Sequence, residues 1–197
     1  MSQNHITSDG FPVTALDISP KSVAATKARL ALKGLTADVR EVDAETLDAQ
    51  NEYDLIWSWG VIHHSSRTAR VLRNLYNALK PGAELRFMVY SLDGAEAYAV
   101  MMSQYMFGFW RGKSLDELLW AHTDGFLARY FTKDSLTNLC RTFFDDVELQ
   151  IFGQESDAIP LPGRLRRLVR PLFSDRYIEK AVRRRGTFLF ATATKQA

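Results

Sequence analysis

Residues 10–20 read GFPVTALDISP, and this stretch decides the fold class. Residues 12–17 form a short apolar run with β-branched members, which predicts a strand that ends on the carboxylate of Asp17. Ser19 and Pro20 follow, and these residue types are typical of a helix N-cap and first helical position. A strand that ends on an acid just before a helix suits a doubly wound α/β protein, in which such an acid usually meets ribose hydroxyls.

The segments downstream continue this alternation. Expected strands at 12–17, 37–44, 54–60 and 83–91 are separated by expected helices at 19–35 and 66–82 and by a polar connection at 45–53. This order predicts a mostly parallel sheet with right-handed crossovers. The strand at 54–60 is almost continuously apolar, which predicts that helices cover it on both faces.

The second half of the chain has a different character. Residues from about 94 to 142 are helical in pattern and rich in Met and aromatic residues, with Thr132 as a candidate N-cap. Alternating strands are expected at 146–153 and 186–194, and a basic stretch separates them. We therefore expect a single domain, 1–197, with a helical insertion at about 94–142 and a basic insertion at about 154–186.

The composition bounds the function class. With 46% hydrophobic and 24% charged residues the chain is typical of a globular protein. Cys140 is the single cysteine, so no intrachain disulfide can form, and no apolar run approaches the about 20 residues that span a bilayer. The N-terminus lacks the apolar core of a signal peptide, and we expect a cytoplasmic protein.

The charge is distributed unevenly. The net charge is +2, but residues 164–185 hold nine basic and two acidic residues, a local charge of +7. This contrast indicates a local anionic contact and not a general nucleic-acid-binding chain. The segment could rest peripherally on an anionic membrane surface or grip an acidic acceptor. The alternative is a solvated helix face whose arginine stems cover apolar surface.

Three expected strand ends carry polar residues or glycine, and in a parallel sheet such ends meet at one edge. Asp17 ends the first, Asp43 the second, and Trp59 and Gly60 the third. A carboxylate can accept hydrogen bonds from ribose hydroxyls or from a base amine, and a glycine lets a ligand approach the backbone. Taken singly, each acid could equally be a helix cap or a turn former.

These acids, together with the run YDLIWSWGVIHH at 53–64 and LKPGAELRF at 79–87, resemble the class I S-adenosylmethionine-dependent methyltransferases of the small-molecule type. The resemblance covers roughly residues 13–90. It implies S-adenosylmethionine as cofactor, with Asp17 and Ile18 at its ribose and Asp43 and Ala44 at its adenine. It further implies that Ser58, Trp59 and Gly60 line the methionine end, and that an antiparallel hairpin closes the sheet.

The family's glycine-rich loop has no counterpart here, since the chain contains no G-x-G sequence. Only sixteen residues precede Asp17, so we expect the family's first strand to be missing, as in a truncated chain. The strands at 12–17 and 54–60 would then either pair directly or leave a gap between them. We expect marginal stability and weak or absent cofactor binding, which micromolar affinity in a calorimetric titration would contradict.

The resemblance implies methyl transfer to a small, apolar or amphipathic acceptor, impaired by loss of the loop, with the helical insertion as a lid. His63 and His64 follow the third strand and could act as a general base; otherwise they are loop histidines bonded to the backbone. No Cys/His spacing predicts a metal site. We interpret Cys140 as a core residue and find no partner for His122.

Two alternatives remain open. A non-catalytic methyltransferase-like binding module would share the fold without the loop. A nicotinamide-dependent oxidoreductase would also place an acid at the ribose, and Tyr76 and Lys80 have the spacing that short-chain dehydrogenases use. However, that pair ends a crossover helix far from the expected ligand edge, and Tyr76 lies on the apolar stripe. We therefore interpret it as a core residue.

Overall fold

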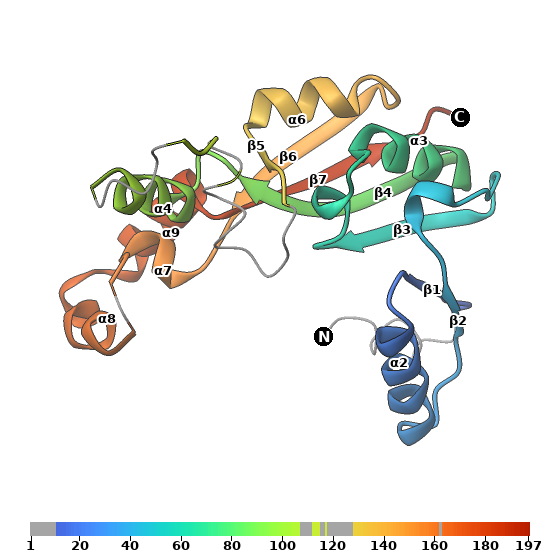
Figure 1. Ribbon diagram of the computed structural model, residues 1–197, viewed down its shortest axis with the longest axis horizontal. Coiled ribbons are helices and arrows are strands. Elements are labelled where there is room, and N and C mark those ends of the chain that lie inside the picture. Colours follow the sequence, from blue (N-terminus) through green and yellow to red (C-terminus); the bar gives the residue numbers. More distant parts are fainter. Residues whose placement is uncertain (1–10, 107–111, 115–116, 118–127, 162) are drawn as a thin grey trace.

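The computed structural model describes residues 11–106, 112–114, 117, 128–161 and 163–197 (Figure 1). The strands are β1 Thr14–Asp17, β2 Asp38–Glu41, β3 Tyr53–Trp59, β4 Leu79–Ser91, β5 Tyr130–Phe131, β6 Asp146–Phe152 and β7 Phe188–Thr194. The α-helices are α2 Pro20–Leu32, α3 Thr68–Ala78, α4 Ala95–Met106, α6 Lys133–Cys140, α7 Glu155–Ala158, α8 Gly163–Val169 and α9 Asp175–Arg185. Short 3₁₀ helices are η2 Ala44–Thr46, η3 Ile62–His64 and η4 Arg170–Leu172.

The N-terminal unit folds as its sequence predicts. β1 and β2 pair in parallel, and α2 connects them. The Ser19 side chain accepts a hydrogen bond from the Ser22 amide, which caps α2, and Gly34 follows the helix with a φ of 64°. Val23, Leu30 and Val39 pack together as a small core of this unit.

The main sheet has the order β3-β4-β7-β6, with β5 beside the end of β4. β3 and β4 run parallel, whereas β7 is antiparallel to both β4 and β6. The expected α/β fold with an antiparallel C-terminal pair of strands is therefore confirmed.

A gap separates the two sheets. β1 pairs with β2 and β3 pairs with β4, and in the described part of the chain no ladder joins β1 to β3. Figure 1 shows the β1–β2–α2 unit beside the β3 edge of the main sheet. Of the two arrangements that the sequence allowed, the gap is the one observed. Facing edges of β1 and β3 therefore keep backbone groups outside any ladder.

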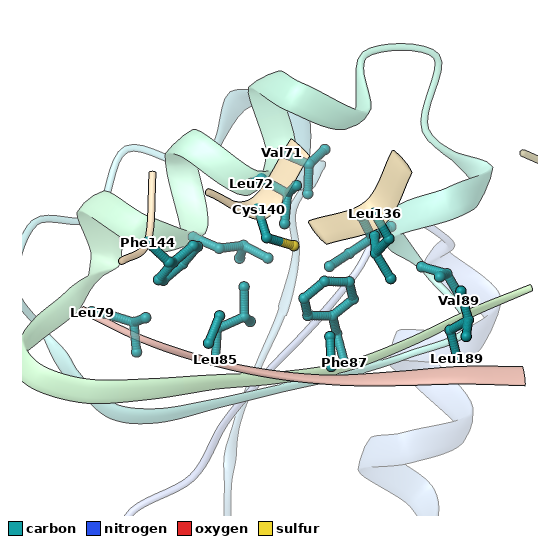
Figure 2. Packing of buried hydrophobic residues seen from close by; sticks show 14 of the residues in the cluster. Val71, Leu72, Leu79, Leu85, Phe87, Val89, Leu136, Cys140, Phe144 and Leu189 are labelled. Carbon is teal, nitrogen blue, oxygen red and sulfur yellow. The ribbon is translucent and has the colours of Figure 1, made fainter. Parts of the chain in front are cut away.

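Helices α3 and α6 cover one face of the main sheet (Figure 1). Phe87 and Leu85 of β4 point up between Leu72 of α3 and Leu136 and Cys140 of α6 (Figure 2). Cys140 is fully buried, and burial raises the pKa of its thiol to about 12. The expected core role of this cysteine is confirmed, since a protonated, enclosed thiol packs as a small apolar group.

The opposite face of β3 corrects one expectation. Leu55, Trp57 and Trp59 are 46%, 41% and 47% exposed, because the described residues place no helix over them. The prediction that this strand is covered on both faces is therefore wrong for the described chain. An apolar run indicates that a strand is suited to burial, but it does not identify which element, if any, covers the strand.

The helical insertion contains α4 and α6, and the short strand β5 lies between them, which the sequence did not predict. Thr132 caps α6 in a reciprocal capping box with Ser135, as expected. His122 lies outside the described residues, as does part of the expected lid. None of the described helices combines the length and apolarity needed to cross a bilayer.

Candidate cofactor and acceptor site

Asp17 and Asp43 lie at the same edge of the β1–β2 pair. The two strands are parallel, Asp17 pairs with Glu41, and Asp43 follows two residues later. The Val42 amide donates to the Asp17 carbonyl at 3.1 Å and extends the pairing by one residue. The arrangement brings both carboxylates to the carboxyl edge, where ligands bind in open α/β sheets.

Each carboxylate also organises its own turn. Asp17 Oδ1 accepts from the Ser19 amide at 2.8 Å, and Asp43 Oδ1 accepts from the Glu45 amide at 2.8 Å. Both acids therefore stabilise turns, which is the alternative role that the sequence left open for them. In each case the second carboxylate oxygen makes no hydrogen bond among the described residues, so it stays open to a ligand. The Ile18 side chain beside them is exposed.

Glu45 connects the Asp43 turn to the segment after β3, a role that its sequence context does not indicate. Glu45 Oε1 accepts hydrogen bonds from the Ser65 hydroxyl at 2.7 Å, the Ser66 hydroxyl at 3.0 Å and the Arg67 amide at 3.2 Å. These donors hold the pKa of Glu45 below its usual range, with the Ser65 bond as the largest cause. The Asp43–Ala44 turn is thereby held against the polypeptide that follows the end of β3.

Gly60 ends β3 in a left-handed conformation, with a φ of 69°. A Cβ built there would lie 3.8 Å from Met88 Cε, so packing alone would admit alanine. The backbone conformation favours glycine, because this region costs other residues about 1–2 kcal/mol. Ser58 and Trp59 precede this turn, and it exposes the backbone at the strand end.

His63 and His64 lie after this turn, in η3. His63 is fully buried, with its ring 4.2 Å from the rings of His64 and Tyr90, centre to centre. Neither ring nitrogen of His63 makes a hydrogen bond of normal geometry. Burial, and secondarily the neighbouring His64, lowers the His63 pKa to about 3, and the Met88 backbone acts in the opposite direction. His63 is therefore neutral at pH 7 and a poor base, whereas His64 is only half-buried.

Aromatic side chains from several strands meet above the same edge. The Trp59 ring stacks on Trp57 at 5.7 Å and contacts Phe152 of β6 at 5.4 Å. Tyr90 at the end of β4 contacts Tyr130 at 5.3 Å and Phe188 at 6.0 Å. This edge therefore offers a large apolar wall beside the two histidines.

Other candidates lie elsewhere. Tyr76 packs edge-on against Phe144, and Lys80 Nζ binds Asp54 at 2.8 Å, both at the amino edge of the sheet. The packing of Tyr76 against the main core agrees with its interpretation as a core residue. An open groove of about 910 Å³ lies between β6 and α9, on the edge strand opposite β3. Within the described residues no cluster of His, Cys, Asp and Glu could hold a metal ion.

The chemistry at this edge fits S-adenosylmethionine in part. Asp17 and Asp43 each keep a free oxygen for hydroxyl or amine donors, and Gly60 exposes backbone at the third strand end. The half-exposed Trp59 ring suits a positively charged sulfonium. The described residues supply no glycine-rich turn to hold the methionine part.

Comparisons with known proteins agree with this fold. A family model described as a methyltransferase domain matches residues 3–85. The ubiquinone biosynthesis O-methyltransferase of Paramagnetospirillum magneticum is 31% identical over 103 residues, which cover 51% of this chain and 41% of that protein. The chain thus spans less than half of that relative.

Solved structures show the same fold at low identity. Phosphoethanolamine N-methyltransferase 2 of Haemonchus contortus, in complex with S-adenosyl-L-methionine, has a TM-score of 0.63 at 17% identity, covering 98% of this chain and 46% of that one. A SAM-dependent methyltransferase of Methanosarcina mazei has a TM-score of 0.62 at 15% identity, with coverage of 98% and 86%. The family model matches residues 3–85, and the fold of the described chain is the one these S-adenosylmethionine-dependent methyltransferases share.

Proposed function

We propose that this chain forms part of an enzyme that transfers a methyl group from S-adenosylmethionine to a small apolar or amphipathic acceptor. The observation that carries the proposal is the location of Asp17 and Asp43 at one carboxyl edge, each with a free oxygen. Asp17, with Ile18 beside it, would hold the ribose hydroxyls, and Asp43 with Ala44 would hold the adenine. Ser58, Trp59 and Gly60 would line the methionine end.

The cofactor, when bound, supplies the electrophilic methyl group, and the residues of this chain position the acceptor and move its proton. Catalysis of this kind depends mainly on alignment and on exclusion of water. His64 is the better candidate base, because His63 is enclosed and its pKa is low. The aromatic wall around Trp59 and Tyr90 supports an apolar acceptor.

The absence of a G-x-G sequence from these 197 residues favours one second candidate, a non-catalytic methyltransferase-like binding module. In either case we expect the chain alone to bind the cofactor only weakly, since the residues above hold mainly its adenosine half. We also propose that the basic segment 164–185 contacts an anionic membrane surface.

Ultraviolet cross-linking with radiolabelled S-adenosylmethionine tests the proposal. We expect label in peptides that contain residues 14–19, 42–47 or 57–61, and we expect excess unlabelled S-adenosylhomocysteine to remove it. Asp17→Asn should reduce the labelling, because the amide is a weaker acceptor for hydroxyls. Asp38→Asn is the matched control, since Asp38 lies at the opposite end of the same strand pair.

Labelling that is confined to other peptides, or that is equal in the two variants, would contradict the assignment. Transfer of label to an added acceptor would separate an enzyme from a binding module. A calorimetric affinity in the micromolar range would contradict the expected impairment of this chain.

A further inference from the structure

Helix α8 exposes large apolar side chains beside its basic ones. Leu165, Leu168 and Leu172 are 51%, 76% and 81% exposed, and their spacing of three and four residues places them on one side of α8 and η4. We call these three residues the leucine stripe. The less exposed positions of the same segment include Arg166 and Arg170. The described residues therefore leave a row of apolar side chains in solvent.

The two partly exposed arginines, Arg166 and Arg170, bond this segment to neighbouring residues. Arg166 Nη2 donates to the Leu161 carbonyl at 3.0 Å, and Arg170 Nη1 donates to the Phe173 carbonyl at 2.9 Å. Arg170 also forms ion pairs with Glu155 of α7 and Asp175 of α9. The exposed leucines thus belong to a segment that hydrogen bonds and ion pairs hold in place, and not to a frayed helix end.

Most of the basic charge around the stripe is not neutralised. Of the nine basic residues between 164 and 185, Arg170 and Arg183 form ion pairs. No described carboxylate lies within ion-pair distance of the other seven, which are Arg164, Arg166, Arg167, Arg176, Lys180, Arg184 and Arg185. A row of exposed leucines among unpaired cations has the chemistry of an interfacial helix.

The stripe also has a distinctive place in the fold. In Figure 1, α8 lies at one end of the long axis, on the side toward which the carboxyl end of β4 points. Helices α7 and α9 lie between α8 and the sheet (Figure 1). A flat surface could therefore meet α8 without displacing the sheet.

We propose that α8, η4 and the basic side chains of α9 dock on a bilayer that contains anionic phospholipid. The leucine stripe enters the headgroup boundary, and the arginines bind lipid phosphates. Charge favours this occupant over a second copy of the chain, because a copy would bring its own local charge of +7 against the first. The proposal does not rest on methyl transfer, since vesicle binding is measured without cofactor.

Co-sedimentation with phosphatidylcholine vesicles, with and without phosphatidylglycerol, tests the proposal. We expect binding only to the anionic vesicles, and we expect added salt to weaken it. The triple variant Leu165→Ser, Leu168→Ser, Leu172→Ser should bind about tenfold or more weakly. Leu32→Ser is the matched control, because Leu32 is 88% exposed at the end of α2. Equal binding of the triple variant and the control, or no binding by the wild type, would overturn the proposal.

A fluorescent label locates the contact. Cys140 is buried, so an environment-sensitive dye will react selectively with Leu168→Cys, and Leu32→Cys provides the reference. We expect a blue shift at residue 168 with anionic vesicles and none at residue 32. A shift at residue 32 alone would overturn the proposal. The proposal would also be overturned if the wild type did not bind the vesicles and instead formed a dimer in sedimentation velocity that the triple serine variant did not form.

Discussion

Replacing Asp157 with alanine should lower the free energy of unfolding by about 3 kcal/mol. Asp157 is buried, and its carboxylate accepts hydrogen bonds from the Thr187 hydroxyl at 2.6 Å, the Thr187 amide at 3.0 Å and the Gln154 amide at 2.9 Å. Hydrogen bonds to a charged group contribute about 1.5–3 kcal/mol each, and the truncation would leave buried donors unpaired. Urea unfolding followed by tryptophan fluorescence measures the loss.

The surroundings of Asp157 explain why little relaxation is expected. A Cβ on Gly153 would lie 1.9 Å from Asp157 Oδ2, and one on Gly186 would lie 2.3 Å from the Phe152 carbonyl oxygen. The backbones of the two ends of the basic insertion therefore meet closely at this carboxylate. Asp146→Ala is the control, because Asp146 is exposed at the start of β6. A loss below about 1 kcal/mol in Asp157→Ala would show that the contact is not a structural anchor.

Acidification should destabilise the protein through His63. Its pKa is lowered from 6.5 to about 3 in the fold, so below pH 6.5 the unfolded chain takes up a proton that the folded chain does not. This contribution to stability is complete above pH 6.5 and is lost progressively as the pH falls toward 3. The full loss is about 5 kcal/mol, because a difference of one in pKa between the folded and unfolded chain corresponds to about 1.4 kcal/mol.

The variant His63→Phe isolates this effect, because it fills a similar volume and does not titrate. We expect a flatter dependence of the unfolding free energy on pH between 6.5 and 3, and unchanged or higher stability at pH 7.5, because two unpaired nitrogens are removed. His64→Phe should keep most of the acid dependence, since burial is the larger cause of the lowered His63 pKa. Parallel pH profiles for the wild type and His63→Phe would contradict the enclosed neutral imidazole.

Local pattern was enough to predict most strands and helices. Asp17 and Asp43 were found because strand ends, turns and caps are encoded within a few residues of one another. The Asp157–Thr187 contact spans thirty residues, and the Glu45–Ser65 contact spans twenty. In the sequence, an acid that makes such a long-range contact cannot be distinguished from a solvent-exposed acid, so neither of these two contacts could be predicted.

The exposed face of β3 illustrates a second limit. The apolar run at 54–60 correctly indicates a strand, but its exposure depends on elements that pack over it from elsewhere in the chain. The strand was therefore located correctly, but the cover expected on both of its faces is missing over Trp57 in the described chain. The exposed leucines of α8 are a similar case, because composition revealed the basic charge and only the fold shows that Leu165 and Leu168 are exposed beside it.

The central claim is that the ends of β1, β2 and β3 form one cofactor site. Amide spectra of the isotopically labelled chain, recorded during titration with S-adenosylhomocysteine, test it most directly. We expect weak, saturable shifts at residues 17–18, 43–45 and 58–60 with one common dissociation constant, lost in Asp17→Asn and kept in Asp38→Asn. Shifts that avoid these three segments, or that saturate at different concentrations in each of them, would contradict it.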